Sequence, residues 1–172
     1  EQTAIGNVAL YGATKGELFA AGSAGERFAV RNSGAHAVVE GVGDYACEYM
    51  TGGIVVVLGQ TGYNFGAGMT GGIAYVYDRS ETFSMRCTME TFDIESVWQE
   101  NDIKELRTLL EKHVRYTESA LAKFILDNWQ MQVSFFLKVI PLEYKKALAR
   151  IKNTENCYAE SISGTEEVYP LY

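Results

Sequence analysis

Several glycine-rich segments carry the residue types of a nucleotide-binding loop. Residues 66–71 read Gly-Ala-Gly-Met-Thr-Gly and match the GxGxxG pattern, in which backbone groups approach a pyrophosphate. That chemistry also needs a helix directly after the glycines, because the helix N-terminus binds the phosphate. Residues 72–77 read Gly-Ile-Ala-Tyr-Val-Tyr instead, which favours a strand. Residues 41–46 are excluded as a dinucleotide site for the same reason. Residues 12–16 lack the Gly-Lys-Ser/Thr ending of a phosphate-binding loop. We therefore predict no cofactor-binding residue in this chain.

The two histidines are the next candidates for chemistry. His36 has Glu40 and Asp44 nearby in the sequence, as a general base would need, but a packed or edge histidine is the favoured interpretation. His113 is expected near the end of a helix, where a cationic side chain interacts well with the helix dipole. With two histidines, three cysteines and no CxxC pair, a four-ligand zinc site is not expected. We predict no catalytic and no metal-binding residue.

The densest group of charged side chains allows two interpretations. We favour a salt-bridged surface of the fold, and an interface or an anion pocket is the alternative. The group consists of Glu26, Arg27, Arg31, Glu40, Asp44 and Glu48.

Composition and charge exclude several classes of protein. The chain has 172 residues, a formal net charge of −7 and no local excess of Lys or Arg, which argues against a nucleic-acid partner. No apolar run approaches the roughly 20 residues of a membrane span, and the N-terminus has no signal-peptide pattern. The cysteines, Cys47, Cys87 and Cys157, are odd in number and far apart. This favours buried, reduced thiols and a cytoplasmic location.

A glycine repeat with a constant period organises the first half of the chain. Sixteen of the 17 glycines lie within residues 6–72. Segments 31–39, 50–58 and 69–77 align without gaps and place glycines at equivalent positions. We interpret these glycines as the corners of a repeated unit, which explains the GxGxxG pattern without a ligand. The structural repeat glycines are Gly34, Gly53 and Gly72, together with Gly43 and Gly62, and Gly22 and Gly41.

The repeat predicts a β-helix. Glycine at this density destabilises helices, whereas short strands with glycine at the bends fit the pattern. The interval from Gly34 to Gly53, and again to Gly72, matches one coil of a parallel β-helix, in which each coil pairs with the next. We therefore predict a mainly β fold, a single-stranded parallel β-helix with glycine corners, followed by an α-helical C-terminal segment.

Stacking of the coils predicts which side chains lie beside one another. The expected ladders are His36–Val55–Ala74, Val38–Val57–Val76 and Ala35–Ile54–Ile73. Both faces of the later strands are mostly apolar, which implies that something covers the outer face of the sheet. We expect the second half of the chain to do so, with Tyr75 and Tyr77 as contacts.

The second half has a helical pattern. Residues 102–105 read as a capping box, with Asp102 as N-cap and Glu105 reaching back. A second helix is expected to start at residues 117–119, residues 133–140 look extended up to Pro141, and a third helix covers about residues 142–151. The expected apolar stripes are Ile103, Leu106, Leu109, Leu110 and Val114 in the first helix, and Leu121, Phe124, Ile125 and Trp129 in the second.

These patterns divide the chain into three parts. We predict β-helix coils over residues 1–92, with earlier coils missing, and a helical segment over 93–152 that packs on the coils or caps them. A polar, loose tail is expected over 153–172.

Long stretches of the glycine repeat match one known family. They include residues 7–14 (NVALYGAT), 25–34 (GERFAVRNSG) and 64–72 (NFGAGMTGG), and a full GxxGxxxG pattern over 59–66. In these stretches the chain resembles the C-terminal glycine-repeat (GXGXG) domain of the glutamate synthase large (α) subunit. The resemblance is dense over about residues 5–78 and continues to about residue 150.

The resemblance implies a right-handed β-helix within an enzyme that forms glutamate from glutamine and 2-oxoglutarate. In that family an amidotransferase domain releases ammonia, and a domain that carries FMN and an iron–sulfur cluster uses it. The glycine-repeat domain has no catalytic residue and packs against the other domains. The resemblance therefore implies a chain that is inactive by itself and that organises the amidotransferase and FMN-binding domains or subunits of glutamate synthase. The FMN and the iron–sulfur cluster are expected to be bound outside this chain.

The sequence also predicts self-association and leaves two alternative functions open. An open N-terminal coil is expected to promote self-association. The chain could instead be the glycine-repeat subunit of a related redox complex such as formylmethanofuran dehydrogenase. A stand-alone β-helix enzyme acting on polysaccharide is the other alternative, and it would need carboxylates and aromatic residues along one exposed ladder.

Overall fold

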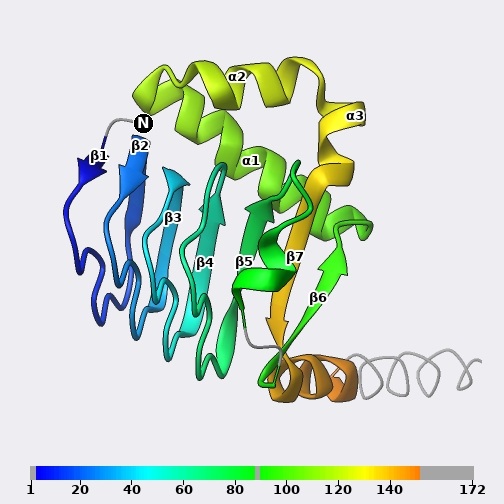
Figure 1. Cartoon of the computed structure of the whole chain (residues 1–172). Helices are drawn as coiled ribbons and strands as arrows, with labels where there is room; N and C mark the ends of the chain where they lie inside the picture. Colours follow the sequence, from blue (N-terminus) through cyan, green and yellow to red (C-terminus); the bar gives the residue numbers. More distant parts are fainter. Residues whose placement is uncertain (1–2, 88–89, 152–172) are drawn as a thin grey trace, which may run out of the picture.

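The chain folds around one seven-stranded sheet. The computed structural model describes residues 3–87 and 90–151. The strands lie in the order β1-β2-β3-β4-β5-β7-β6, and Figure 1 shows β7 inserted between β5 and β6. Their bounds are β1 (Thr3–Ile5), β2 (Glu17–Ala24), β3 (Ser33–Gly41), β4 (Thr51–Val57), β5 (Gly71–Tyr77), β6 (Phe92–Ser96) and β7 (Phe136–Pro141).

The first five strands belong to successive coils of a β-solenoid. Each pairs in parallel with the next, and the solenoid makes about four turns before the helices toward the C-terminus. The predicted fold class, a mainly β parallel solenoid followed by helices, is confirmed. β7 pairs antiparallel with β5, and β6 pairs antiparallel with β7, so the sheet continues beyond the last parallel strand. The extended segment expected over 133–140 is only partly as predicted. Residues 133–135 form a 3₁₀ helix, and the strand includes Pro141, where the sequence predicts its end.

The pairing of β3 differs by one residue from the prediction. His36 pairs with Ile54 and not with Val55, whereas the pairings predicted between β4 and β5 are confirmed. β3 contains one extra residue at this point, and the side chain of Asn32 supports it. Its Oδ1 accepts the backbone N–H of Ala35 (2.9 Å) and its Nδ2 donates to the carbonyl oxygen of Ala35 (2.9 Å). The observed ladders are His36–Ile54–Ile73, Ala37–Val55–Ala74, Val38–Val56–Tyr75 and Val39–Val57–Val76.

Across the interior from the strands, the solenoid is closed by four turns with an uncommon backbone. They cover residues 7–12, 26–31, 44–49 and 63–68, and we call them the turn wall. Every second residue has positive φ: Val8, Leu10, Gly12, Arg27, Ala29, Arg31, Tyr45, Cys47, Tyr49, Asn64, Gly66 and Gly68. L-residues with side chains rarely adopt this conformation, so the surrounding structure must stabilise it.

Hydrogen bonds between coils provide that stabilisation. Arg27 donates its backbone N–H to the carbonyl oxygen of Asp44 in the following coil (2.8 Å), and Ala29 donates to Ala9 in the preceding coil (2.9 Å). The same alternation recurs along the wall, as when Cys47 donates back to the carbonyl oxygen of Phe28 (2.8 Å). The coils are therefore hydrogen-bonded to each other on two sides, through the sheet and through the turn wall.

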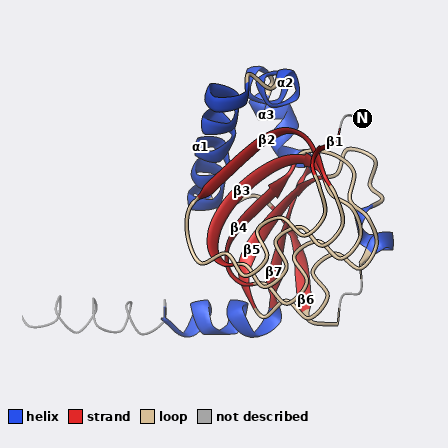
Figure 2. Ribbon diagram, turned by 90° about the vertical axis from the view of Figure 1, so that its left-hand side faces the viewer, coloured by secondary structure: helices blue, strands red, loops and turns tan. Residues whose placement is uncertain are grey.

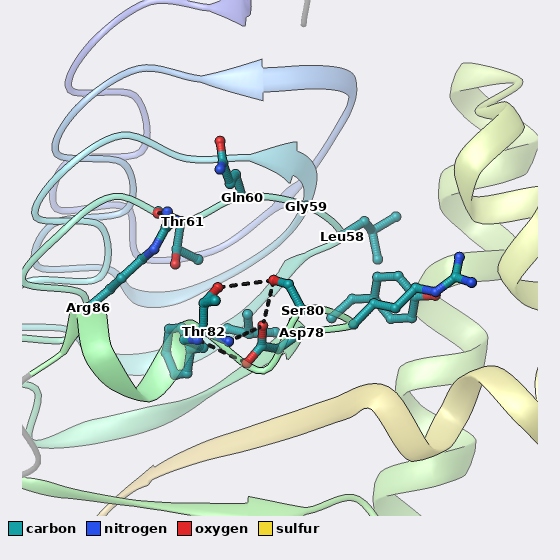
Figure 3. Close-up of a pocket in the computed structure, with 12 residues that line it drawn as sticks. Leu58, Gly59, Gln60, Thr61, Asp78, Ser80, Thr82 and Arg86 are labelled. Atoms are coloured by element: carbon teal, nitrogen blue, oxygen red, sulfur yellow. Dashed lines mark hydrogen bonds between the residues drawn. The ribbon is translucent and has the colours of Figure 1, made fainter.

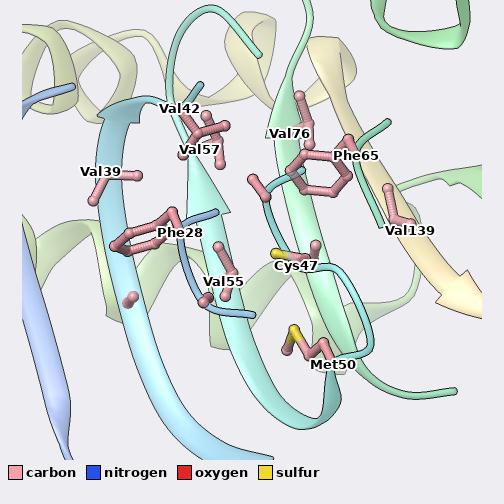
Figure 4. Packing of buried hydrophobic residues seen from close by; sticks show 14 of the residues in the cluster. Phe28, Val39, Val42, Cys47, Met50, Val55, Val57, Phe65, Val76 and Val139 are labelled. Atoms are coloured by element: carbon pink, nitrogen blue, oxygen red, sulfur yellow. The ribbon is translucent and has the colours of Figure 1, made fainter. Parts of the chain in front are cut away.

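The inner core lies between the sheet and the turn wall. Figure 4 shows Phe28 and Cys47 from the turns beside Val39 and Val55 from the strands, and all four side chains are fully buried. Alternate strand residues point inward, as the period of two in a strand requires. Burial of this apolar surface is the main source of stability for such a core.

Helices cover the outer face of the sheet. α1 (Glu100–Thr117), α2 (Ala120–Asp127) and α3 (Trp129–Gln132) follow one another, with short 3₁₀ helices η1 (Phe83–Arg86) and η2 (Val133–Phe135) elsewhere. Figure 2 shows α1 on the side of the sheet away from the tan turns. The predicted cover and the predicted contacts of both tyrosines are confirmed. Tyr75 packs with Leu106 and Leu110, and the hydroxyl of Tyr77 donates to Oε1 of Gln132 (2.5 Å).

The start of α1 differs from the prediction. The helix begins at Glu100 with Gln99 as N-cap, and Gln99 makes no side-chain capping bond. Asp102 is therefore not the cap, and no capping box forms with Glu105. Both carboxylates instead accept hydrogen bonds from the hydroxyl of Tyr75 on the sheet, which explains why they lie near the helix start.

The second helix is partly as predicted. Ser119 caps α2, since its hydroxyl accepts the backbone N–H of Ala122 (3.0 Å). The helix ends at Asp127, so Trp129 belongs to α3, and Phe124 is 46% exposed and not on the packed stripe. Residues 142–151 are helical, as expected. The division at residues 92 and 93 stays a prediction, and the tail expected over 153–172 lies outside the described residues.

Replacing Gly53 by Val is expected to destabilise the fold by roughly 1–3 kcal/mol. Gly53 has a φ of +83°, and an added Cβ would overlap the carbonyl oxygen of Ala35 in the preceding coil. Urea unfolding of the two proteins measures the difference. Gly6→Val is the matched control, because φ at Gly6 is not positive and nothing lies within 4 Å of an added Cβ. Equal destabilisation of both variants would contradict the role assigned to Gly53.

Candidate functional site

The GxGxxG segment is part of the turn wall. Gly66 and Gly68 both have a φ of +67°, and the backbone N–H of Gly66 donates to the carbonyl oxygen of Ala46 (2.8 Å). This N–H is used between coils and is not directed at a ligand. β5 begins at Gly71, so a strand follows these glycines where a dinucleotide site requires a helix N-terminus.

The repeat glycines lie against neighbouring coils. An added Cβ would overlap the carbonyl oxygen of Thr14 at Gly34, and the backbone N–H of Asp44 at Gly62. Gly72 has a φ of +78°, and an added Cβ would lie 2.9 Å from the carbonyl carbon of Gly52 and the carbonyl oxygen of Gly53. These contacts support the prediction that the repeat glycines are structural, which the Gly53 variant tests.

His36 lies half-buried on the outer face of β3. It lines a cavity of about 400 Å³ between the sheet and α1, beside Glu17 and Lys112, which form an ion pair (2.5 Å). The carboxylates near it in sequence, Glu40 and Asp44, accept hydrogen bonds from other groups. No acid–base pair of the kind that a general base would need is assembled at His36.

His113 forms a buried polar cluster with Glu40 and Ser119. The imidazole is fully buried, its Nε2 lies 3.7 Å from Oε1 of Glu40, and neither ring nitrogen has a hydrogen-bond partner. Burial lowers the pKa of His113 below its usual 6.5, although the carboxylate of Glu40 acts in the opposite direction. The side chain is therefore neutral at pH 7. The predicted interaction of a cationic His113 with the helix dipole is wrong, because α1 continues to Thr117 and the imidazole packs against the ring of Phe19 (6.2 Å).

The three residue types of this cluster also occur in hydrolytic triads. In a triad the serine hydroxyl donates to the histidine, which acts as base. Here the hydroxyl of Ser119 donates to Glu40 and also accepts the N-cap bond of α2. The serine is committed to two structural contacts, and no nucleophile–base pair is formed.

A second polar cluster joins α1 to the sheet. The hydroxyl of Tyr75 donates to Oε2 of Glu105 (3.1 Å) and to Oδ1 of Asp102 (3.3 Å), and Nζ of Lys138 donates to Oδ2 of Asp102 (2.7 Å). Burial, followed by the charges of Glu105 and Asp102, raises the pKa of Tyr75, so the phenol stays protonated and donates. Lys138 is only 5% exposed, and its charge is compensated by Asp102. The cluster positions α1 on the sheet.

A cavity of about 210 Å³ lies where the chain leaves β5. Figure 3 shows Asp78, Ser80 and Thr82 joined by hydrogen bonds on one side, and Thr61 beside Arg86 on the other. Asp78 accepts hydrogen bonds from the hydroxyl of Ser80 and the backbone N–H of Thr82, and Arg86 donates to the carbonyl oxygen of Thr61. These polar groups fold the loop after β5 against the last coil.

The charged group predicted as a salt-bridged surface is not salt-bridged at its arginines. Among the described residues, neither Arg27 nor Arg31 forms an ion pair. The guanidinium of Arg27 lies 5.8 Å from the ring centroid of Tyr45. Oδ1 of Asp44 accepts the backbone N–H of Tyr63 (2.7 Å). The carboxylates of Asp44 and Glu40 thus serve the backbone and the His113 cluster, and the interface alternative remains.

The thiols and possible metal ligands offer no site in the described residues. Cys47 is buried in the inner core, and burial raises the pKa of its thiol. Cys87 is half-buried, and Cys157 lies outside the described ranges. Within residues 3–87 and 90–151, no three His, Cys, Asp or Glu side chains are grouped so that they could hold a metal ion. In the same ranges no helix has the length and apolar character to cross a membrane.

Comparison with known proteins identifies the repeat. A family model described as the GXGXG motif matches residues 1–142. The chain belongs to the GXGXG family. This GXGXG chain is 54% identical over 149 residues to the glutamate synthase [NADPH] large chain of Bacillus subtilis, covering 86% of the chain and 10% of the relative. It is 57% identical over 150 residues to the glutamate synthase [NADH] of Schizosaccharomyces pombe, covering 87% and 7%. It is 54% identical over 140 residues to the ferredoxin-dependent glutamate synthase of Pyropia yezoensis, covering 81% and 9%.

The GXGXG chain spans a tenth or less of the length of these relatives. Its residues do not fit the FMN and iron–sulfur cluster that the resemblance implies for the whole enzyme. Cluster ligands must be grouped thiolates, but Cys47 is buried in the inner core, and in the described ranges no three His, Cys, Asp or Glu side chains are grouped to hold a metal ion. The turn-wall N–H groups that could face a phosphate donate to neighbouring coils.

Sequence reasoning misses the conformation and the exposed side chains of the turn wall. It places the corners of the coils at glycines, whereas Arg27, Tyr45 and Tyr49 also adopt positive φ. The equivalent positions hold Arg27 and Arg31 in the second turn and Tyr45 and Tyr49 in the third, but Val8 and Gly12 in the first, so no residue type marks the conformation.

Replacing Tyr75 by Phe is expected to destabilise the protein by about 1.5–3 kcal/mol, because the partly buried carboxylates of Asp102 and Glu105 lose a donor. Thermal and urea unfolding measure the loss. Tyr63→Phe is the matched control, since the side chain of Tyr63 is 61% exposed, and its stability should stay within about 0.5 kcal/mol of wild type. Wild-type stability of the Tyr75 variant would show that the cluster does not hold α1.

The stability of the protein is expected to fall as the pH drops from 7 to 5, in part because of His113. A histidine whose pKa is lowered on folding contributes stability above its unfolded pKa of about 6.5, and the contribution is lost as the pH falls below that value. The slope for one proton is at most about 1.4 kcal/mol per pH unit. Urea unfolding at several pH values should show a smaller slope for His113→Leu.

Glu40→Gln provides the opposite test. The variant keeps an oxygen for Ser119 but removes the charge that favours protonated His113, so it should lose more stability than wild type by pH 5. Equal pH slopes in all three proteins would contradict the role of His113.

Proposed function

We propose that this chain is a non-catalytic structural domain of glutamate synthase, the enzyme that forms glutamate from glutamine and 2-oxoglutarate. In this proposal it organises the amidotransferase and FMN-binding parts, which carry the chemistry, and is inactive by itself. The observation that carries the proposal is sequence identity of 54%, 57% and 54% to glutamate synthases from three organisms over most of this chain. The same comparisons favour glutamate synthase over formylmethanofuran dehydrogenase.

The geometry supports a structural role. The polar side chains that could do chemistry are used to hold elements together, as Glu40 and Ser119 are at α2 and Tyr75 is at α1. The sheet and the turn wall are hydrogen-bonded from coil to coil, which gives a rigid body. A rigid body can fix the distance and orientation of other domains. The free thiol of Cys47 supports the expectation of a reducing, cytoplasm-like compartment.

The test is to mix the purified chain with the amidotransferase and flavin parts of the same source. We expect a complex by size-exclusion chromatography, and an increase in the fraction of ammonia released from glutamine that appears as glutamate. The chain alone should form no glutamate. If no complex forms and the fraction does not change, the proposed function is wrong.

A further inference from the structure

We infer that the turn wall is the surface through which this chain binds the rest of the enzyme, and that its occupant is a folded protein surface that presents carboxylates. The inference rests on the proposed function and adds to it the place of contact. The turn wall consists of residues 7–12, 26–31, 44–49 and 63–68, and Figure 2 shows these turns on the side of the sheet away from α1.

The exposed side chains of the turn wall are of the types that dominate protein interfaces. Tyrosine and arginine are enriched among the residues that carry most of the binding energy. Five of the 12 large apolar side chains exposed in the described residues lie on this wall: Val8, Tyr11, Tyr45, Tyr49 and Tyr63. Arg27 and Arg31 are exposed among them. The other seven are scattered over the chain from η1 to residue 151, with at most two on any one helix.

The backbone beneath these side chains is fixed before any partner binds. Arg31 donates its N–H to the carbonyl oxygen of Glu48 (2.9 Å), and Tyr45 and Tyr49 donate to the carbonyl oxygens of Tyr63 and Ala67 in the next coil (both 2.9 Å). A surface that is already ordered loses less entropy on binding.

The side chains are positioned too. The guanidinium of Arg27 lies over the ring of Tyr45, and the ring of Tyr49 lies directly over Gly68, where an added Cβ would overlap it. Because Gly68 has no side chain, the ring of Tyr49 can pack directly on its backbone. The wall thus presents Arg27, Tyr45 and Tyr49 in adjacent coils with set positions, and Arg31 is exposed on the same turn as Arg27.

Charge indicates what occupies the wall. Arg27 and Arg31 have no ion-pair partner in the described residues, which leaves two guanidinium groups to bind carboxylates bidentately. Three carboxylates lie on the same wall, at Glu26, Asp44 and Glu48, so a polyanion such as nucleic acid would be repelled. A partner with mixed charges fits this arrangement, which is the character of a folded protein surface.

The length of the relatives indicates where that surface comes from. At least nine-tenths of each glutamate synthase lies outside the part that matches this chain. The outer face of the sheet is already covered by α1 and α2, and so cannot contact other domains directly. The turn wall is the long side of the solenoid that carries a continuous set of exposed tyrosine and arginine.

The test uses variants that preserve the left-handed backbone of the turns. Asp and Asn tolerate positive φ better than other residues with side chains, so Arg27→Asp with Arg31→Asp, and Tyr45→Asn with Tyr49→Asn, are suitable double variants. The matched control is Arg115→Glu with Tyr116→Gln, because Arg115 lies over the ring of Tyr116 in the same way (5.7 Å), but on α1. Calorimetric titration measures the affinity of each chain for the remaining parts of the enzyme.

We expect both turn-wall variants to bind at least about tenfold more weakly than wild type, and the control to stay within about twofold. The affinity of the wild-type chain should also fall as salt is raised, because charged pairs contribute. If a variant melts at a lower temperature, nitration of tyrosines in the wild-type chain replaces it. Tyr45, Tyr49 and Tyr63 should then be protected in the complex, and Tyr116 should not.

The outcomes separate the two proposals. If the wild-type chain does not bind the rest of the enzyme, the proposed function fails. If it binds and the turn-wall variants bind equally well, or the tyrosines stay reactive, only the assignment of the surface is wrong. If the wild-type chain forms dimers that the variants do not form, the occupant is a second copy of this chain, and the inference is also overturned.

Discussion

In a stack of short coils, the backbone of each coil must find its hydrogen-bond partners in the coils above and below it. In this protein the requirement is met twice in every coil, once in the parallel sheet and once in the turn wall. In the turns, residues such as Arg27 and Ala29 have positive φ, and the N–H groups of successive positive-φ residues donate alternately to the following and the preceding coil. The cost of this conformation is offset by bonds that would otherwise be missing inside the protein.

The turn wall also explains how the core is closed. Phe28 and Phe65 occupy equivalent positions between residues with positive φ and point to the inner face of the sheet. A loosely held loop would leave these rings free to move, and the core would lose its dense packing. The hydrogen-bonded turns hold them in place, so backbone satisfaction and burial of apolar surface depend on the same few residues in each coil.

The sequence predicts those features that depend on a period, and misses those that depend on one contact. The even spacing of Gly34, Gly53 and Gly72 reveals the solenoid, and the helical spacing of Leu106 and Leu110 reveals α1. The one-residue shift at β3 depends on the side-chain amide of Asn32, and the spacing of the repeat does not reveal this contact. The left-handed turns at Arg27 and Tyr45 contradict the intrinsic preference of those residues, and only the neighbouring coils explain them. The charge state of His113 depends on burial by residues that are distant in sequence, such as Phe19 and Glu40.

The described residues form no recognisable active site, because their buried polar clusters are already used in structural contacts. A catalytic group needs a polar side chain with free bonding capacity in a place that a substrate can reach. Two groups whose pKa is shifted by burial, Tyr75 and His113, lie between the sheet and the helices, and their polar neighbours are committed to Lys138 or Ser119. Such clusters are directional, so they fix the place of α1 and α2 on a sheet whose apolar face would accept several placements. What remains free to interact is the exposed layer of side chains, and a rigid solenoid presents that layer in one arrangement.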